Sequence, residues 1–443
     1  MYNNKKILVL GLAKSGYEVC KVLSKLNCDI TLNDININQD ENIINDLKKR
    51  NIKIILGEHP DDLLDTSFSY VIKNPGIKID HKYVLKAKEL GIPVINEMEV
   101  GYNLIREKAN VTIIGITGTN GKTTTTTLIY EILKEKYPNN VHLCGNIGFP
   151  LCSFVEKVKD KDILVIETSC QQLENLVNYK PDIAVLTNIT KAHLEFMKTY
   201  EHYKYVKGKI FQNQTKSDVL IVNNNDTNSK ELVKTAKSKI KYFGIDTYIK
   251  DNYIYYLNNQ VISLNDIILR GNHNYENIMA SIMVCKELNV EDEIIRKVLK
   301  TFKGVEHRLE FVRKVNDRIF YNDTEATNIK CTQIALSSFN EKIIVILGGY
   351  ERGQDFNDLK DYLTNVKAIL AIGETKDRVE KFALDNNILC YKYEHLKDAV
   401  IKGYEISSPN DIILLSPASA SWDQYKKCED RGDEFKKIVN TLE

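Results

Sequence analysis

The segment IIGITGTNGKTTTTT at residues 113–127 decides the fold of this chain. It starts as an apolar strand, turns at Gly118 and Gly121, and continues as a helical pattern to residue 136. This order is typical of a phosphate-binding loop, in which backbone N–H groups and a helix N-terminus face an anion. The usual G-x-x-x-x-G-K-[ST] spacing requires glycine at position 116, where this chain has Ile116. We interpret the segment as a variant loop in which Ile116 completes the strand and Gly118 makes the turn.

Side chains in and after the loop suit a nucleotide site. Lys122 adds a full positive charge, and the hydroxyls of Thr123 and Thr124 are available to a phosphate or a Mg²⁺ ion. Glu167 follows the apolar run DILVI, so we expect it at the carboxyl edge of a parallel sheet, where open α/β folds bind ligands. His193 lies shortly after a further strand end. The alternatives are a helix cap for Glu167 and a structural role for His193.

Short apolar runs alternate with helical patterns along the chain, which favours α/β units with parallel sheets. The predicted strands lie at 6–12, 69–77, 111–118, 162–169, 182–190, 218–226, 342–350, 368–374 and 411–419, and residues 241–270 have the pattern of short hairpin strands. We therefore expect an α/β protein of three domains. These are a Rossmann-like domain at 1–96, a central domain at 97–303 with a P-loop ATPase-like parallel sheet and a small added β-sheet, and a Rossmann-like domain at 304–443.

The first 34 residues have a Rossmann-like pattern of strand, turn, helix and strand. Their glycine fingerprint is incomplete, because Ala13 stands between Gly11 and Gly16 where G-x-G-x-x-G requires glycine. Asp34 ends the second strand, where such folds often contact a ribose or a base. A plain strand-to-helix turn explains this block equally well, so it is weak evidence for nucleotide binding.

The composition argues against several classes of protein. With 61 Lys and Arg against 60 Asp and Glu, the net charge of +1 gives no support for nucleic acid or an anionic membrane as a partner. The nine cysteines form no C-x-x-C pair, which indicates scattered thiols in a reducing cytosol. No run approaches the roughly 18 apolar residues of a membrane span. We expect a soluble, cytoplasmic, monomeric protein.

A series of short motifs is similar to motifs of the Mur ligases of peptidoglycan synthesis. They are GLAKSG (11–16), NPGI (74–77), GTNGKT (118–123), GNIG (145–148), ETS (167–169), NIT (188–190), GNHNYENIMAS (271–281), EHRLE (306–310), YNDTEATN (321–328), GGYERG (348–353) and SPASASWDQY (416–425). The chain resembles this family over essentially its whole length. The resemblance implies that the first domain holds the UDP part of a substrate, the central domain holds ATP and metal, and the C-terminal domain brings an amino acid.

The resemblance also implies site residues, motif by motif. Those on the side of the UDP substrate are Lys14, Ser15, Asp34, Asn74, Gly76 and Asn146. Those for ATP are Gly118, Thr119, Asn120, Gly121, Lys122, Thr123, Thr124, Asn277, Arg308 and Asp323. Two Mg²⁺ ions are implied at Thr123, Glu167, His193 and a carbamylated Lys207, and the amino acid at Thr327, Arg352 and Ser421. Lys122, His193 and Lys207 are the implied catalytic residues.

Carbamylation would turn the Lys207 ammonium into an anionic oxygen ligand, which suits a hard metal such as Mg²⁺. Lys204 and Lys209 lie close to it in the sequence, and a solvated helix lysine is the alternative for this position. The modified lysine therefore stays an expectation that only the family resemblance supports.

The activity implied is ATP-dependent addition of D-glutamate to UDP-N-acetylmuramoyl-L-alanine through an acyl phosphate. Three positions on the amino-acid side depart from the family pattern. Glu325 stands where lysine is usual, Cys428 replaces a common phenylalanine, and Arg352 keeps the positive charge of its position. An arginine at that position permits a bidentate carboxylate contact.

Other classes of function are open from the sequence. Within the same class the alternatives are another Mur-type ligase or a folylpolyglutamate synthetase, although the D-N-P-[AN]-R motif of ligases that add a diamino acid is absent from the sequence. A nucleotide-binding module without turnover is a second alternative, against which Lys122, Glu167 and His193 argue. An NAD-dependent dehydrogenase rests only on the first 34 residues.

Overall fold

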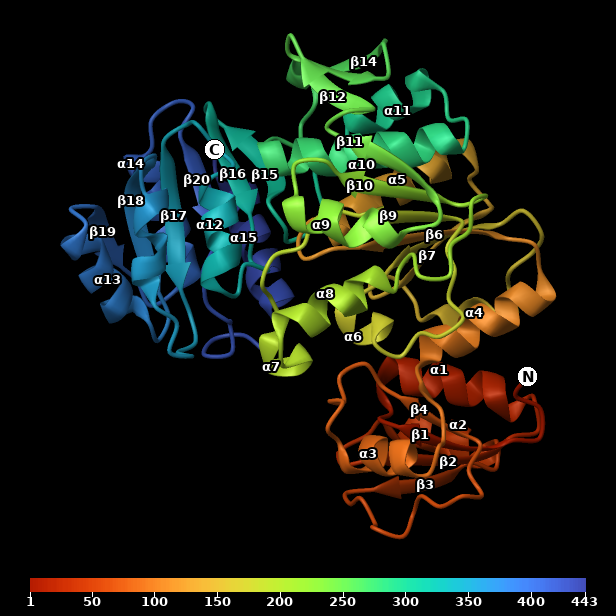
Figure 1. Cartoon of the computed structure of the whole chain (residues 1–443). Helices are drawn as coiled ribbons and strands as arrows, with labels where there is room; N and C mark the ends of the chain where they lie inside the picture. The colour runs from red at the N-terminus through yellow and green to blue at the C-terminus, as the bar shows by residue number, and fades with distance from the viewer. The chain divides into compact units, whose positions relative to one another are not determined.

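The protein is represented by a computed structural model that describes residues 1–443, apart from the side chain of Glu195. Three mainly parallel sheets follow one another along the chain (Figure 1). Met1–Val261 with Glu276–Ile295 form one compact unit, and Ile262–Tyr275 with Arg296–Glu443 form a second. The predicted α/β class with three sheets is confirmed.

The first sheet has the strand order β3-β2-β1-β4-β5, and its strands are parallel. Helices α1 and α2 cover one face through Val19 and Leu47, and α3 covers the other through Ala87. The order reverses between β1 and β4, and such a reversal opens a crevice at the carboxyl ends of the two strands. The elements are β1 (Lys6–Leu10), α1 (Ala13–Ser24), β2 (Asp29–Asp34), α2 (Glu41–Lys49), β3 (Lys53–Leu56), β4 (Tyr70–Lys73), α3 (Lys82–Glu89) and β5 (Val94–Ile95).

The central sheet has nine strands in the order β14-β13-β12-β11-β10-β9-β6-β8-β7. Its strands are β6 (Thr112–Thr117), β7 (Val141–Gly145), β8 (Ile163–Glu167), β9 (Ile183–Leu186), β10 (Val219–Asn223), β11 (Lys239–Phe243), β12 (Thr247–Lys250), β13 (Tyr253–Tyr256) and β14 (Asn259–Ser263). Strand β12 joins β11 through the single pair Phe243 and Thr247. The predicted small β-sheet is therefore an extension of the edge of the central sheet.

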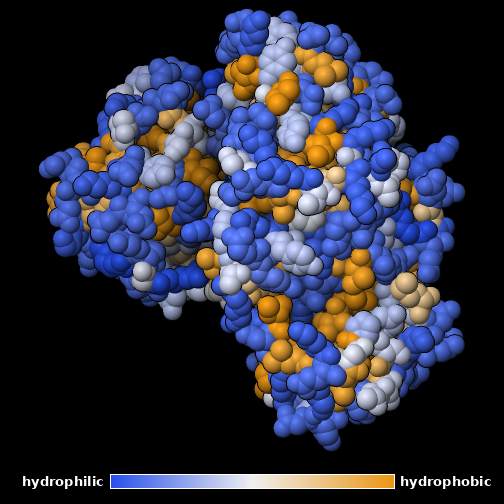
Figure 2. All heavy atoms as spheres, in the orientation of Figure 1, coloured by the Kyte–Doolittle hydropathy of each residue, from blue (hydrophilic) through white to orange (hydrophobic). Residues whose placement is uncertain are grey.

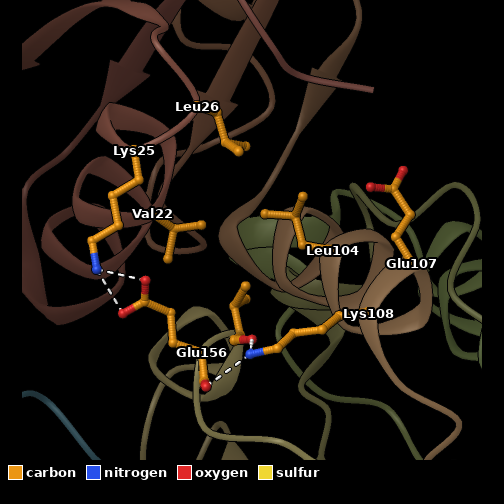
Figure 3. Close-up of a pocket in the computed structure, with 8 residues that line it drawn as sticks. Val22, Lys25, Leu26, Leu104, Glu107, Lys108 and Glu156 are labelled. Atoms are coloured by element: carbon orange, nitrogen blue, oxygen red, sulfur yellow. Dashed lines mark hydrogen bonds and ion pairs between the residues drawn. The ribbon is translucent and has the colours of Figure 1, made fainter.

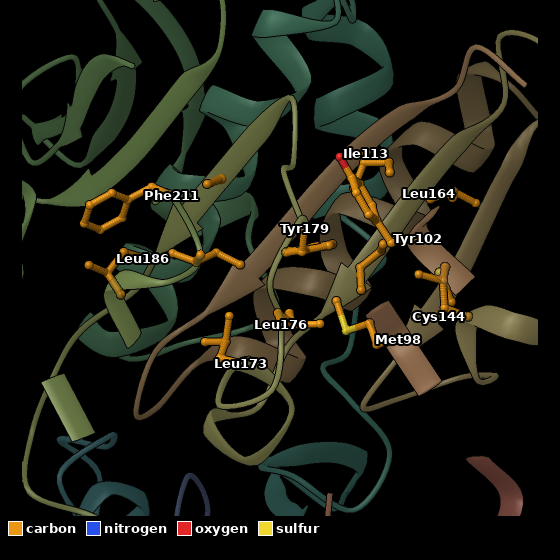
Figure 4. Close-up of a cluster of buried hydrophobic side chains, with 14 of the residues drawn as sticks. Met98, Tyr102, Ile113, Cys144, Leu164, Leu173, Leu176, Tyr179, Leu186 and Phe211 are labelled. Atoms are coloured by element: carbon orange, nitrogen blue, oxygen red, sulfur yellow. The ribbon is translucent and has the colours of Figure 1, made fainter. Parts of the chain in front are cut away.

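Helices on one face of the central sheet enclose a large apolar core. Met98 and Tyr102 of α4 meet Leu164 and Leu186 of the sheet there (Figure 4). The helices of this part of the chain are α4 (Glu97–Lys108), α5 (Lys122–Lys136), α6 (Cys170–Leu173), α7 (Leu194–Met197), α8 (Tyr200–Gly208), α9 (Thr227–Leu232), α10 (Asn272–Glu287) and α11 (Asp292–Leu299), with short 3₁₀ turns η1 (Leu151–Phe154), η2 (Val233–Thr235) and η3 (Leu264–Asp266).

The third sheet has the order β15-β16-β20-β17-β18-β19 and is parallel except for the β15–β16 hairpin. Helices α12 and α13 cover one face, and α14 and α15 cover the other. Alternate residues of β17, such as Val345 and Ile346, point to opposite faces, and both are fully buried. The elements are β15 (Glu310–Val315), β16 (Arg318–Asn322), α12 (Ile329–Leu336), β17 (Ile343–Gly348), η4 (Phe356–Tyr362), β18 (Val366–Ile372), α13 (Lys376–Asp385), β19 (Leu389–Lys392), α14 (Leu396–Ile406), β20 (Ile412–Leu415) and α15 (Cys428–Thr441).

A small cavity of about 250 Å³ lies between α1, α4 and the segment that follows η1 (Figure 3). At its rim the Lys25 ammonium lies 2.6 Å from the Glu156 carboxylate, and the Lys108 ammonium donates to the carbonyls of Val155 and Glu156. Its other walls are mainly aliphatic, and none of the predicted site residues lines it.

Hydrophilic residues dominate the face shown in Figure 2, and apolar residues form small scattered groups on it. Within the described residues, no helix combines the length and the apolar character that crossing a membrane requires.

Candidate functional site

The predicted phosphate loop joins β6 to α5 and packs tightly. Gly121 has φ +81° and precedes α5, and a Cβ atom there would collide with Asn277 Oδ1. The same Asn277 oxygen accepts a hydrogen bond from Thr125 Oγ1 at 3.2 Å. The fold thus brings Asn277, predicted for ATP, against the loop although 156 residues separate it from Gly121 in sequence.

Asn188 orders the first half of the loop. Its backbone carbonyl accepts from the Thr119 N–H at 2.8 Å, and its side-chain oxygen accepts from the Asn120 N–H at 2.9 Å. Lys122 Nζ donates to the Thr119 carbonyl at 2.9 Å. The sequence analysis did not assign a role to Asn188, although the motif NIT, which it begins, was the available signal.

Three neighbouring strands deliver the polar residues to one sheet edge. In the register of β8, β6 and β9, Glu167 pairs with Ile116, and Leu186 pairs with Thr117. The phosphate loop, Glu167 and the segment that leads to His193 therefore leave the sheet side by side. His193 is exposed, has φ +53° and precedes α7.

The two carboxylate oxygens of Glu167 have different surroundings. Its Oε1 accepts from Asn146 Nδ2 at 2.7 Å, and the Asn146 N–H also donates to the Glu167 carbonyl. Its Oε2 is buried and has no hydrogen-bond partner among the described residues. Because a buried acceptor without a donor is costly, this oxygen suits a hard cation. Asn146, predicted on the side of the UDP substrate, thus contacts the predicted metal ligand.

Lys207 on α8 is buried beneath the loop. Only 1% of its surface is exposed, and its Nζ donates to Gly118 O at 2.8 Å and to Thr117 Oγ1 at 3.0 Å. Burial lowers the pKa of Lys207 to about 7, and the charge of Lys122 acts in the same direction. The buried position rules out a solvated helix lysine here. Lys204 instead pairs with Glu201, and Lys209 donates to the Glu174 carbonyl, so Lys207 is the lysine that reaches the loop.

The first domain has a cavity of about 430 Å³ at the carboxyl ends of β1 and β4. Asp34 and Asn74, both predicted on the UDP side, line it. The Asp34 carboxylate accepts from the backbone N–H groups of Leu12 and Asn36, at 2.7 and 2.8 Å. The cavity therefore has an anchored carboxylate at the strand-order reversal, where open α/β sheets bind ligands.

The remaining UDP-side residues surround Asn74. Its Nδ2 donates to Ser15 Oγ at 2.9 Å, and its Oδ1 accepts from the Gly76 N–H at 3.0 Å. Lys14 lies beside Ser15 in the first turn of α1 and is exposed. The cavity is also lined by His59 and His81, whose rings meet edge to face at 4.8 Å between centroids. The sequence analysis missed both histidines because no motif marks them.

In the third domain, Asp323 follows β16 and is buried. Its two oxygens accept from the Leu309 N–H at 3.1 Å and from Ser416 Oγ at 2.8 Å, and burial raises its pKa to about 7. Arg308 Nη2 lies 3.2 Å from Glu325 Oε2. The cation predicted for ATP thus has an anionic neighbour that departs from the family pattern.

The residues predicted for the amino acid lie in three loops of the third domain. Ser421 Oγ is buried and has no hydrogen-bond partner among the described residues. The Arg352 guanidinium stacks over the exposed Trp422 ring at 5.3 Å. Thr327 follows Glu325, whose Oε1 accepts from Cys428 Sγ at 3.2 Å. The fold brings Glu325 and Cys428 into contact.

A buried arginine connects two of these loops through hydrogen bonds. Arg431 is 1% exposed, and its guanidinium donates to Thr324 Oγ1 and to the carbonyls of Thr324 and Ser419, at 3.0 to 3.1 Å. It therefore ties the segment of Thr327 to the segment of Ser421. The sequence analysis did not single it out.

Three α/β domains with a phosphate-binding loop on the central sheet define a multidomain P-loop nucleotide-binding protein. The chain belongs to the Mur ligase family. Family profiles match over residues 5–96 (Mur ligase MurD-like, N-terminal domain), 116–285 (Mur ligase middle domain) and 307–419 (Mur ligase, glutamate ligase domain).

Curated relatives match along the whole chain. The UDP-N-acetylmuramoylalanine–D-glutamate ligase of Geobacillus kaustophilus is 42% identical over 449 residues, which cover 100% of this chain and 98% of that protein. The enzyme of the same name from Listeria monocytogenes is 41% identical over 449 residues, with the same coverage.

Solved structures share the fold at low identity. MurF ligase of Thermotoga maritima in complex with ADP has a TM-score of 0.60 at 17% identity and covers 93% of this chain and 95% of that chain. UDP-N-acetylmuramate-alanine ligase MurC of the same organism has a TM-score of 0.58 at 17% identity and covers 99% of both chains.

Proposed function

We propose that this chain is an ATP-dependent ligase that joins D-glutamate to the alanine carboxylate of UDP-N-acetylmuramoyl-L-alanine, in cytoplasmic synthesis of peptidoglycan precursors. In this proposal residues 1–96 bind the UDP substrate, 97–303 bind ATP, and 304–443 bind D-glutamate, in a monomer. The relatives that carry this name, 41–42% identical over the whole chain, support it. The observation that carries it is the sheet edge that holds the phosphate loop, the open Glu167 oxygen and the buried Lys207.

The first step is phosphoryl transfer. The substrate carboxylate attacks the γ-phosphorus of ATP, which forms an acyl phosphate and releases ADP. Negative charge spreads over the transferring group, and fixed positive groups that face it lower the barrier. Lys122 and the N-terminus of α5 are those groups, and the Asn188 contacts hold the loop in place for them.

The residues beside the loop fit a hard cation through the open Glu167 oxygen. Mg²⁺ held by Thr123, Glu167, His193 and the Lys207 carbamate would neutralise phosphate charge when bound. The carbamate forms when the neutral Lys207 amine adds to CO₂ and releases a proton. The Thr117 hydroxyl accepts from Lys207 Nζ and donates to the Thr168 carbonyl at 2.6 Å, so it holds the amine beside the Gly118 carbonyl.

The second step forms the amide. The neutral amino group of D-glutamate attacks the acyl carbon, and the tetrahedral intermediate expels phosphate. Arg352, kept in place by its stack on Trp422, offers two N–H groups to one acceptor carboxylate. The open Ser421 hydroxyl and Thr327 supply further donors in this proposal.

Phosphate release from ATP tests the proposal. The protein is given UDP-N-acetylmuramoyl-L-alanine with D-glutamate, L-glutamate or other amino acids in separate reactions. Release with D-glutamate is expected, Lys122→Met should lose it, and Lys134→Met, exposed in the last turn of the same helix, should keep it. Release with no amino acid tested would refute ligase activity.

A different acceptor amino acid is the second candidate, and Glu325 is the observation that favours it. A carboxylate beside Arg308 weakens the positive field that a dianionic acceptor requires. Phosphate release with another amino acid alone, in the same set of reactions, would select this candidate.

A further inference from the structure

Lys73, at the end of β4, is among the largest fully buried side chains of the protein. Its Nζ donates to the Ile77 carbonyl at 2.7 Å and to the Asn74 carbonyl at 3.4 Å. No carboxylate of the described residues forms an ion pair with it. Glu174 raises its pKa, but that carboxylate already accepts from His202 Nε2 at 2.9 Å. Lys73 is therefore a buried cation whose described contacts are two carbonyls and the face of the Phe196 ring, 5.9 Å away, with no carboxylate among them.

Such an arrangement is expensive for the folded state. A buried charge without a counterion loses its hydration, and even buried ion pairs are often replaced by apolar residues without loss of stability. Burial lowers the pKa of Lys73 to about 8, in line with this cost. Because Lys73 contributes so little to the stability of the folded state, we attribute its presence to a ligand that carries negative charge.

The two carbonyls that hold Lys73 belong to the wall of the 430 Å³ cavity. Asn74 and Ile77 both line it, and a Cβ atom on Gly11 would lie 2.8 Å from Asn74 Cβ. The turn at 74–77 therefore packs on the glycine turn that precedes α1. The N-terminus of α1 has no side-chain cap, and Leu12 and Ala13 at its start line the same cavity.

The charge of Lys73 acts on one residue of the cavity wall. Burial lowers the pKa of His81, which lines the cavity, and Lys73 is one of the positive groups that lower it further. Among the carboxylates of the lining, Asp80 pairs with Lys198 at 2.6 Å and Asp34 is bound to two backbone N–H groups. A ligand diphosphate here would be the anion that Lys73 lacks.

We propose that Lys73 is a positioning residue for the diphosphate of the nucleotide substrate. Lys73 holds the carbonyls of Asn74 and Ile77 in place and adds positive potential to the cavity, without touching the ligand. This inference rests on the proposed function, since it assumes that the cavity binds the UDP part of the substrate.

Calorimetric titration of the full-length protein with uridine, UMP and UDP tests it. Lys73→Met removes the charge and the donors, whereas Lys73→Gln removes the charge and keeps a donor for the Ile77 carbonyl. Both variants should bind UDP about tenfold more weakly than the wild type, bind UMP with a smaller loss, and bind uridine unchanged. Lys53→Met, exposed at the start of β3 on the opposite edge of the sheet, should bind all three ligands like the wild type.

The outcomes separate the hypotheses. Equal losses for uridine and UDP, or no loss for UDP, would overturn the role of Lys73 while the wild type still binds UDP. A wild type that binds none of the three ligands would overturn both this role and the proposed UDP site. If the methionine variant does not fold, the glutamine variant alone decides, because it keeps a side-chain donor for the Ile77 carbonyl.

Discussion

Replacing Gly121 by alanine probes whether the loop conformation is the one that binds nucleotide. Gly121 has φ +81°, and a residue with a Cβ atom pays about 1–2 kcal/mol for a left-handed backbone. The new Cβ would also displace Asn277 and break its buried hydrogen bond with Thr125, which adds about 1 kcal/mol. We expect Gly121→Ala to lower the free energy of unfolding by about 2–3 kcal/mol and to weaken ATP binding at least tenfold.

Gly91→Ala is the matched control. Gly91 has φ +70°, and a Cβ atom there would meet nothing within 4 Å. Alanine at this position therefore costs only the free energy of a left-handed backbone, with no steric clash. We expect a loss of about 1–2 kcal/mol and unchanged ATP affinity. Denaturant unfolding measures the first quantity and calorimetry with ATP the second. A folded Gly121→Ala protein that binds ATP like the wild type would refute the assignment of this loop.

Three further predictions follow from individual side chains. Lys207→Ala should lose phosphate release and regain part of it with added short carboxylic acids, which supply an oxygen ligand; unchanged activity would contradict the carbamate. Glu325→Lys should lower the KM for D-glutamate about tenfold, because an anion near a dianionic acceptor becomes a cation, and a raised KM would count against this. Burial raises the pKa of Glu97 to about 7 from its usual 4.5, so the stability contributed by its protonated form is lost as the pH rises through 7. Glu97→Gln should therefore raise the Tm more at pH 8 than at pH 5, and equal shifts at both pH values would contradict it.

Local patterns in the sequence predicted much of the fold. The apolar run before Gly118 forms β6, and the apolar run before Thr168 forms β8. Short continuous apolar runs are typical of strands in a parallel sheet, because such strands are buried on both faces. Both predicted strands are longer than the observed ones. Their last residues turn away from the ladder, and those turns carry the polar groups of the site.

Contacts between distant segments were harder to predict. The burial of Lys207 depends on the docking of α8 beneath the loop, and its spacing in the sequence cannot distinguish it from Lys204 or Lys209. The contact between Asn146 and Glu167 was likewise not predicted, because the motif of Asn146 does not indicate which side chain lies beside it in the fold. The burial of Lys73 was not predicted either, because it involves Phe196, which lies 123 positions further along the chain.

The lone hydroxyl of Ser421 has a consequence for inhibitor chemistry. It is buried, and no described protein group satisfies it, so a small molecule that places one acceptor or donor there gains a hydrogen bond for which the protein has already been desolvated. Replacing that polar atom of the compound by a carbon of similar size would remove the gain and leave the shape almost unchanged. In a series of fragments that starts from this contact, the polar group that bonds to Ser421 should therefore add more binding free energy per atom than the atoms added later.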